Sequence, residues 1–368
     1  MRSKYFWLSA AVLVFILLLT RSGQQTKTNI SVVIYAQEIS ATHNGRSWPT
    51  VKILRKTEKA EPETLAEVGK VGEFPIDYQL SPDKKFLLIN LESKLQILDL
   101  TSKELKELFI PKRGVQSVSY SPDGKQLFIW DQKYIPGDKD NDNYYIHRFT
   151  ISNRKDEIIK QGVSKPVFYG EAWRTDGKVI LNKVKGESFT PYYFDLADNQ
   201  IVKTPGLGDD VPGGGLLSES GRAMAIVKDW TGDICDAFTG VTPETYDIIE
   251  PVSGKILGTV GSPDNSVTIL AFSPDDTEVF YQTERPWDNQ EDCDRSTEKF
   301  YFQAKIAENQ VIPVSQPAEF LRSWTKNYVG ATVNYNYENR IWSVLINGQS
   351  IATSSERARL VIAGQYYQ

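Results

Sequence analysis

The stretch Tyr120-Ser121-Pro122-Asp123-Gly124-Lys125 decides the fold, because near-copies of it recur along the chain. Leu80-Ser81-Pro82-Asp83 and Phe272-Ser273-Pro274-Asp275 repeat its core, and each copy lies between two apolar, strand-like runs. Proline fixes φ at about −65° at the second turn position, and aspartate accepts hydrogen bonds from the backbone that follows it. A turn that recurs at one point of a strand–turn–strand unit indicates an array of all-β units, which commonly closes into a propeller.

The repeating unit is a strand, the Ser-Pro-Asp turn, an apolar strand, a loop, an alternating strand, a polar turn and a last strand. The clearest copy spans 74–110, and further copies begin near 118, 172, 217, 269 and 320. Two strand-rich pieces remain, at 30–68 and 355–367, and together they supply one more unit that joins the chain ends and removes exposed edges. The sequence therefore predicts an all-β β-propeller with seven blades, with six blades as the alternative.

These repeats resemble the repeats of TolB-type, WD-like β-propellers, which also occur in prolyl-oligopeptidase-like peptidases. The resemblance lies in Ser-Pro-Asp-Gly-Lys at 121–125, its relatives at Ser81 and Ser273, and the Asp-Leu pairs at 99–100 and 195–196. It covers about 74–314 and implies a fold rather than an activity. No Gly-x-Ser-x-Gly nucleophile elbow occurs in the chain, so we expect a propeller without the hydrolase domain of those peptidases.

The N-terminus resembles an export signal. Arg2 and Lys4 precede an apolar run at 5–20, whose length lies between a signal-peptide core and a full transmembrane span. We expect a hydrophobic helix at 1–22 that acts as an uncleaved signal anchor, with a cleaved signal peptide as the alternative. Residues 23–29 form a linker, and 30–368 form a propeller closed by pairing of the N- and C-terminal strands. Either signal places the propeller outside the cytoplasm, in the periplasm or at the cell surface.

Charge and composition narrow the class of partner. The chain has 368 residues, a net charge of −5 and a pI of about 5.4, which argues against nucleic acid as a partner. With only two histidines and two cysteines, a zinc site built from those ligands is not expected. We expect the protein to be a monomer.

Antiparallel strands place the Ser-Pro-Asp turns at one end of every blade and the long insertions at the other. Long loops on a rigid scaffold are where binding residues concentrate. The long insertions are 131–143, 228–245 and 282–298, with shorter ones at 40–49 and 183–191. Their tryptophans and acids are the candidate binding residues: Trp48, Trp130, Trp230, Trp287, Asp233, Asp236, Asp288 and Asp292. Insertions with these acids and tryptophans suit a cationic peptide, a Ca²⁺-assisted contact or a glycan stacked on an indole ring. The alternative is that the loops are solvated and the tryptophans pack between blades.

Asp138, Asp140 and Asp142 occupy alternate positions in the first long insertion, as the oxygen ligands of a Ca²⁺ loop do. Asn143 replaces the central glycine of an EF-hand, and Phe149 stands where its last glutamate belongs. An EF-hand is therefore excluded. A looser Ca²⁺ site and a solvated turn remain alternatives, and Ca²⁺ is the one cofactor that we consider.

Cys235 and Cys293 lie in equivalent insertions of consecutive blades. In an exported protein, a pair placed in this way indicates a disulfide. The alternative is two free thiols. Because acidic residues flank both cysteines and raise a thiol pKa, a nucleophilic role is disfavoured.

The insertion residues support two classes of function. We expect a scaffold in the cell envelope that binds an envelope protein, a peptide or a glycan and is tethered to the membrane by its N-terminal helix. The alternative is a carboxylate-dependent hydrolase of the glycosidase kind on the same face. The sequence names no catalytic residue: His147 lies in a strand pattern, and His43 lies in a loop without an identifiable partner.

Overall fold

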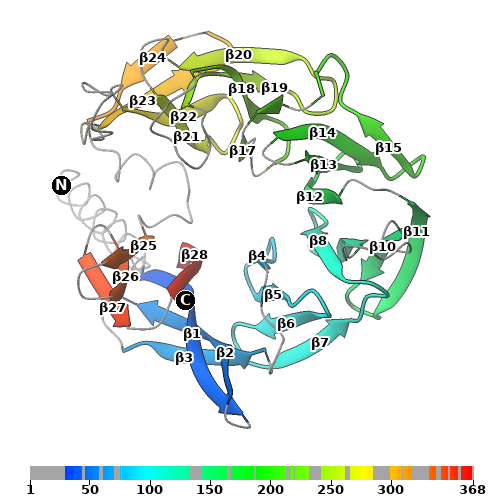
Figure 1. Cartoon of the computed structure of the whole chain (residues 1–368), viewed down its shortest axis with the longest axis vertical. Helices are drawn as coiled ribbons and strands as arrows, with labels where there is room; N and C mark the ends of the chain where they lie inside the picture. The colour runs from blue at the N-terminus through cyan, green and yellow to red at the C-terminus, as the bar shows by residue number, and fades with distance from the viewer. Residues whose placement is uncertain are drawn as a thin grey trace, which may run out of the picture.

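The computed structural model describes residues 30–366 except for short gaps. The gaps are 44–45, 58–60, 70–74, 76, 133–142, 164–166, 186–187, 210, 213–215, 219, 232–241, 262–265, 285–298, 309, 316–330, 337–340, 347–348 and 355–357. The described part is all β-structure and contains no helix. Its strands form seven sheets that follow one another around a ring (Figure 1).

Sheets 1 to 3 are built from residues 30–163 and the last strand, β28. Sheet 1 has the order β28-β1-β2-β3, and sheets 2 and 3 run in chain order. Sheet 1 contains β1 (Ile30–His43), β2 (Arg46–Thr57), β3 (Glu63–Val68) and β28 (Ala358–Tyr366). Sheet 2 contains β4 (Asp77–Leu80), β5 (Phe86–Asn90), β6 (Leu95–Asp99) and β7 (Leu105–Phe109). Sheet 3 contains β8 (Val115–Tyr120), β9 (Gln126–Asp131), β10 (Asn143–Thr150) and β11 (Lys155–Val163).

Sheets 4 to 7 continue around the ring in chain order. Sheet 4 contains β12 (Val167–Trp173), β13 (Lys178–Lys185), β14 (Ser188–Asp195) and β15 (Gln200–Lys203), with β16 (Val211–Pro212) paired to β14. Sheet 5 contains β17 (Leu216–Leu217), β18 (Met224–Thr231), β19 (Thr242–Ile249) and β20 (Ile256–Gly261). Sheet 6 contains β21 (Ser266–Phe272), β22 (Glu278–Glu284), β23 (Lys299–Lys305) and β24 (Gln310–Pro313). Sheet 7 contains β25 (Ala331–Asn336), β26 (Ile341–Ile346) and β27 (Gln349–Ser354).

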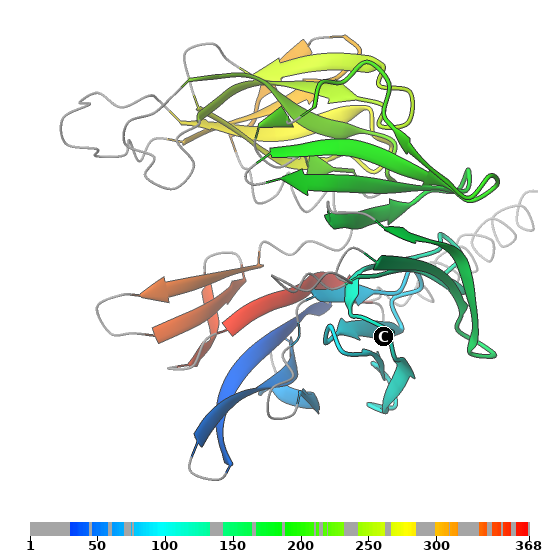
Figure 2. The ribbon, with the colours of Figure 1, turned by 45° about the vertical axis from the view of Figure 1, so that its right-hand side comes forward.

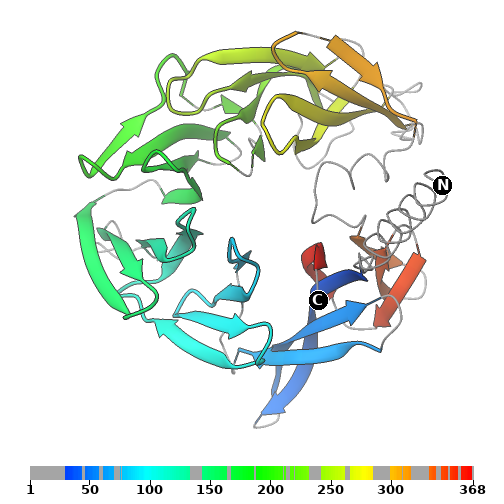
Figure 3. The same cartoon turned by 180° about the vertical axis from the view of Figure 1, so that it is seen from behind.

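The two ends of the described chain meet in sheet 1. Strand β28 pairs antiparallel with β1, with Ala36 opposite Arg359 and Ile34 opposite Ile362. Figure 3 shows the two strands side by side from behind the ring. A first strand that pairs with the last one leaves fewer unpaired strand edges.

The core lies between consecutive sheets. Side chains alternate along each strand, so Leu87 and Ile89 pack with sheet 1 whereas Leu88 packs with sheet 3. Strand β9 repeats this division, because Leu127 joins the cluster shared with sheet 2 and Phe128 joins the cluster shared with sheet 4. Both faces of these strands are therefore buried.

The recurring turn has one hydrogen-bond pattern. In the second copy, the Ser121 hydroxyl donates to Asp123 Oδ1 (2.7 Å) and accepts the amide of Gln126 (2.9 Å). The turns at Ser81 and Ser273 repeat both bonds. Gly124 has φ 70°, a left-handed conformation that glycine adopts without a steric penalty. The motif is thus a closed local unit that begins the second strand of its sheet.

A test of the close packing between sheets 5 and 6 is Gly258→Ala in β20. An added Cβ would lie 2.1 Å from the carbonyl oxygen of Ile306, which is backbone and cannot rotate away. We expect the variant to lose about 1–3 kcal/mol of stability, measured by thermal unfolding. The control is Gly208→Ala, where a Cβ meets nothing within 4 Å. Equal melting temperatures for the two variants would contradict the packing.

Candidate binding surface

The connections between strands divide the ring into two faces. In sheet 2, the amide of Leu100, after the third strand, donates to the carbonyl of Lys85, in the first turn (2.9 Å). The same bond recurs in sheet 3 from Ile151 to Lys125 and in sheet 6 from Ile306 to Thr277. The short turns of these sheets therefore lie together on what we call the turn face. The second-to-third connections and the links between sheets leave from the opposite end, the insertion face.

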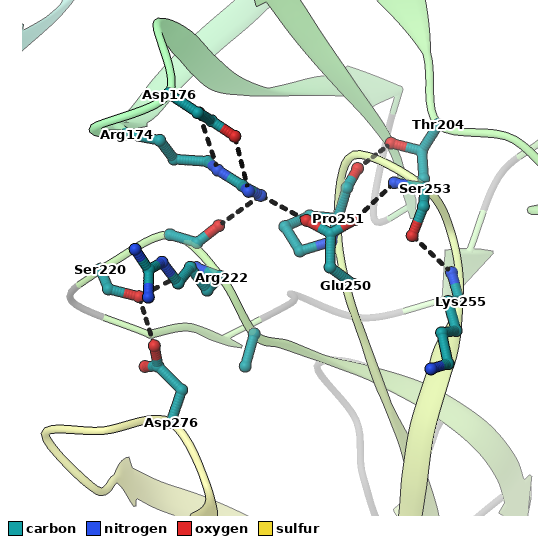
Figure 4. Close-up of polar contacts among 12 residues, drawn as sticks. Arg174, Asp176, Thr204, Ser220, Arg222, Glu250, Pro251, Ser253, Lys255 and Asp276 are labelled. Carbon is teal, nitrogen blue, oxygen red and sulfur yellow. Dashed lines mark hydrogen bonds and ion pairs between the residues drawn. The ribbon is translucent and has the colours of Figure 1, made fainter.

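On the turn face, Arg174 ties sheet 4 to sheet 5 (Figure 4). It stands where other copies of the turn have serine, and its guanidinium donates to Asp176 (2.9 and 3.2 Å), to the carbonyl of Gly221 (3.3 Å) and to Glu250. Burial acts to raise the pKa of Glu250, but hydrogen bonds from Arg174 and Ser253 outweigh it and lower the pKa. Glu250 is thus held as an anion opposite the guanidinium.

Further bonds between sheets stiffen the same face. Ser220 Oγ donates to Asp276 Oδ2 of sheet 6 (2.5 Å), and Thr204 Oγ1 donates to the carbonyl of Pro251 (2.6 Å), as Figure 4 shows. Between sheets 2 and 3, Gln79 Nε2 donates to the carbonyl of Val118 (2.6 Å). The turn face is therefore a framework of directional contacts between sheets.

On the insertion face, Asp131 holds the link between sheets 2 and 3. It ends β9 immediately before the 133–142 insertion, and its carboxylate accepts the amides of Lys112 (2.6 Å), Arg113 (2.8 Å) and Gly114 (2.9 Å). The side chain is fully buried. Burial acts to raise the pKa of Asp131, but the His147 imidazole and the three amides outweigh it and lower the pKa. Asp131 is a buried, satisfied anion with a structural role.

His147 lies inside sheet 3 between two carboxylates. Its Nδ1 lies 2.9 Å from Asp156 Oδ1, and its Nε2 lies 3.5 Å from Asp131 Oδ2. Its ring packs edge-on against Phe109, with centroids 5.0 Å apart. At 1% exposure, the imidazole does not reach the surface.

Trp130, one of the candidate binding residues, is fully buried between sheets 3 and 4. Its indole stacks on Tyr144 with centroids 4.9 Å apart, and its Nε1 donates to Gln132 Oε1 (2.9 Å). Trp130 therefore supports the insertion face from beneath. In this structure its ring offers no platform for a ligand.

Two more candidate tryptophans lie in strands. Trp48 lies in β2 opposite Ala41, and Trp230 lies in β18 opposite Pro243. The β1–β2 pairing continues beyond the partners that β28 and β3 provide, so the hairpin projects from the ring (Figure 2). The expected insertions at 40–49 and 183–191 are thus mostly paired strand, because each pair of strands extends further than the turn signals indicate.

The remaining candidates lie outside the described residues. They are Trp287, Asp233, Asp236, Asp288 and Asp292, the proposed Ca²⁺ ligands Asp138, Asp140 and Asp142, and the cysteines Cys235 and Cys293. The N-terminal segment 1–29 also lies outside them. Within the described residues, no three histidine, cysteine or acidic side chains are grouped to hold a metal ion. The same part of the chain holds no helix of the length and apolarity that crossing a membrane requires.

Sequence reasoning missed two features near the 133–142 insertion. One is the cradle of amides around Asp131, whose signal is an acid directly after an apolar strand. The other is Lys112, whose ammonium lies 4.4 Å from the centroid of the Tyr145 ring. That pair is a cation–π contact between the link that joins sheets 2 and 3 and strand β10 of sheet 3.

Comparisons with known proteins identify the fold alone. No family model matches the chain, and no curated protein matches its sequence. Oligogalacturonate lyase from Vibrio parahaemolyticus has a similar structure, with a TM-score of 0.51 and 11% identity over 78% of this chain and 79% of that chain. TolB from Acinetobacter baumannii matches with a TM-score of 0.43 and 18% identity over 78% of this chain, which spans 64% of the TolB chain. The predicted TolB-like, WD-like β-propeller is confirmed as a fold.

The amide cradle predicts the effect of Asp131→Asn. The new amide group would face a backbone donor in place of a carboxylate oxygen, so we expect a loss of about 2 kcal/mol or more. Because the pKa of Asp131 is lowered in the folded state, its stabilisation is present above the unfolded pKa of about 3.9 and is lost as pH falls through the folded value. The gap between wild type and variant therefore narrows below about pH 4 in thermal melts.

The control is Asp156→Asn, whose carboxylate contacts the same histidine but is 39% exposed. We expect this variant to lose less than about 1 kcal/mol. A gap between wild type and Asp131→Asn that stayed constant on acidification would refute the assignment of Asp131 as a stabilising anion.

Proposed function

We propose that the protein is an exported, membrane-anchored β-propeller that acts as a binding scaffold in the cell envelope. The observation that carries the proposal is the difference between the two faces of the ring. Contacts such as Arg174 with Glu250 hold neighbouring sheets together on the turn face, whereas the insertion face bears the long connections that follow Asp131, Thr231 and Glu284. A rigid frame that displays loops on one side is the usual arrangement of a binding protein.

The architecture that we propose has seven blades, one for each sheet, so that the chain ends meet in the first blade. Residues 1–22 would form a signal anchor with a cytoplasmic N-terminus, and 23–29 would link it to the propeller. The apolar run at 5–20 and the preceding Arg2 and Lys4 support this proposal. The propeller would then lie outside the cytoplasm.

The partner that we propose is an envelope protein or peptide that presents positive charge, and a glycan is the second candidate ligand. The acids Asp233, Asp236, Asp288 and Asp292 support a cationic partner. Trp48, Trp230 and Trp287 support contacts with aromatic or sugar rings. Ca²⁺ at Asp138, Asp140 and Asp142 would assist such a contact.

A carboxylate-dependent hydrolase remains the alternative function. The acidic insertions favour it, and a structure of similar fold is named as an oligogalacturonate lyase. At 11% identity that likeness extends to the fold alone. In the described part of the insertion face, Asp131 is occupied by three backbone amides and is not free for acid–base chemistry.

The binding proposal is tested by affinity capture from envelope extract with the tagged full chain in mild detergent. We expect a specific partner whose recovery falls about ten-fold for Asp288→Asn combined with Asp292→Asn. The control is Asp198→Asn, an exposed acid in the β14–β15 turn on the turn face. Parallel captures with Ca²⁺ and with EDTA test the metal.

Equal recovery by both variants would remove the acidic insertions as the binding surface. Turnover of a glycoside panel that is lost in the Asp288/Asp292 variant would establish the hydrolase alternative instead.

We also propose that Cys235 and Cys293 form a disulfide between the insertions of sheets 5 and 6. Peptide mapping without reductant is expected to find the two peptides linked, and reduction is expected to lower the melting temperature. Two free thiols in protein taken from the envelope would exclude the bridge.

A further inference from the structure

A pocket of about 220 Å³ opens between sheets 2 and 3 on the turn face. Its apolar lining comes from both sheets, with Phe86, Ile97 and Leu108 from sheet 2 and Ile151 from sheet 3. The pocket is separate from the insertion face and from every residue that the proposed function uses. Apolar walls with a few charged groups are the usual composition of a small-molecule site.

The side of the pocket formed by the first turns is acidic, and both acids are more than half exposed. Asp83 and Asp123 line it from the first turns of the two sheets. Hydrogen bonds from the serine hydroxyls of their turns lower the pKa of both carboxyls, so both are anions at neutral pH. In each turn Oδ1 accepts the serine hydroxyl, and Oδ2 forms a long ion pair with a lysine of the same turn, Asp83 with Lys85 (4.0 Å) and Asp123 with Lys125 (3.7 Å). Neither ion pair is short enough to be a hydrogen bond. Both Oδ2 atoms therefore keep the capacity to accept a hydrogen bond.

The side of the pocket formed by β7 and the β10–β11 turn is basic. Lys106 lies on β7, the fourth strand of sheet 2, and Arg154 lies in the β10–β11 turn. The Arg154 guanidinium is anchored by one hydrogen bond to the carbonyl of Glu107 (2.7 Å), and Lys106 pairs with the exposed Glu104 (2.8 Å). A guanidinium has five N–H donors, so the arginine keeps donors for an anion.

Tyr120 supplies the observation that points to a ligand. It lines the pocket at the end of β8 and is 9% exposed, and its hydroxyl has no hydrogen-bond partner among the described residues. Burial and the charge of Asp83 raise the pKa of Tyr120, so the hydroxyl stays protonated. An unpaired buried hydroxyl costs stability. The Tyr120 oxygen is enclosed in this structure, so a ligand carbonyl that pairs with it requires neighbouring side chains of the pocket to move aside.

We propose that this pocket binds a short zwitterionic peptide of three residues with both ends free. The peptide ammonium lies between Asp83 and Asp123, its carboxylate lies at Lys106 and Arg154, and a backbone carbonyl accepts the Tyr120 hydroxyl. Adjacent strands lie about 4.8 Å apart, so the first turn and the fourth strand are separated by about 10–12 Å. An extended chain spans about 3.3–3.6 Å per residue, so three residues span about 10–11 Å and match this separation.

Isothermal titration calorimetry of the full chain with the tripeptide Leu-Gly-Leu tests the proposal. We expect saturable binding that weakens about ten-fold when the N-terminus is acetylated and about ten-fold when the C-terminus is amidated. Tyr120→Phe keeps the ring and removes the unpaired hydroxyl, so it is expected to weaken binding without lowering the melting temperature.

The matched pair of variants is Asp123→Asn and Asp275→Asn. Both acids occupy the same position in the same Ser-Pro-Asp turn and accept the same serine bond (2.7 Å), but Asp275 does not line the pocket. We expect Asp123→Asn alone to weaken the peptide. No saturable heat from the wild type, indifference to either end cap, or equal loss in both variants would overturn the proposal.

These outcomes are independent of the proposed scaffold function. The pocket variants lie on the turn face and are expected to recover the envelope partner at wild-type levels. A failure of affinity capture therefore leaves the peptide test intact, and the reverse also holds.

Discussion

The strands of this ring must bury both of their faces, because each sheet packs between two neighbours. Leu87 and Leu88 are adjacent in β5, yet one packs with sheet 1 and the other with sheet 3. This constraint explains why the second strands read as continuous apolar runs rather than as alternating ones. It also explains why no sheet is a folding unit alone: each apolar face is covered only when the next repeat is in place. The need to cover the apolar face of each sheet therefore explains why the unit is repeated.

Neighbouring sheets pack closely, and different contacts hold them together on the turn face and on the insertion face. In β20, Gly258 lets the sheet approach the Ile306 carbonyl, which a Cβ would meet at 2.1 Å. On the turn face, the bond from Ser220 to Asp276 and the Arg174–Glu250 ion pair add directional contacts across the sheet boundaries. On the insertion face, Asp131 fixes one link from below through three backbone amides. The scaffold is thus constrained close to both ends of its strands.

The sequence predicted those parts of the fold that depend on hydrogen bonds between residues close together in the chain. The Ser-Pro-Asp turns form their hydrogen bonds within six residues, so Ser121 and Asp123 identify the turn without any tertiary partner. Contacts between sheets gave no comparable signal: Arg174 and Glu250 are 76 positions apart, and Arg174 occupies the turn position where other copies have serine. Trp130 shows the same limit for the candidate site. It borders a long insertion, but strand alternation directs its indole into the core between sheets 3 and 4. Composition identifies residues that lie next to a loop. Which face of the strand such a residue occupies depends on the register of the strand.

Two buried polar groups in sheet 3, Asp131 and Tyr120, differ in whether their surroundings supply hydrogen-bond partners. Asp131 is a charged group whose burial is compensated by three amides, so its local environment accounts for it fully. Tyr120 is a neutral group whose hydroxyl is unpaired among the described residues, although the same strands supply many donors and acceptors. Ser119 Oγ and His147 Nε2 in the same sheet also lack a hydrogen-bond partner among the described residues, so the missing partner alone does not distinguish Tyr120. What distinguishes Tyr120 is its place in a pocket that is also lined by two acids, Asp83 and Asp123, and by two bases, Lys106 and Arg154.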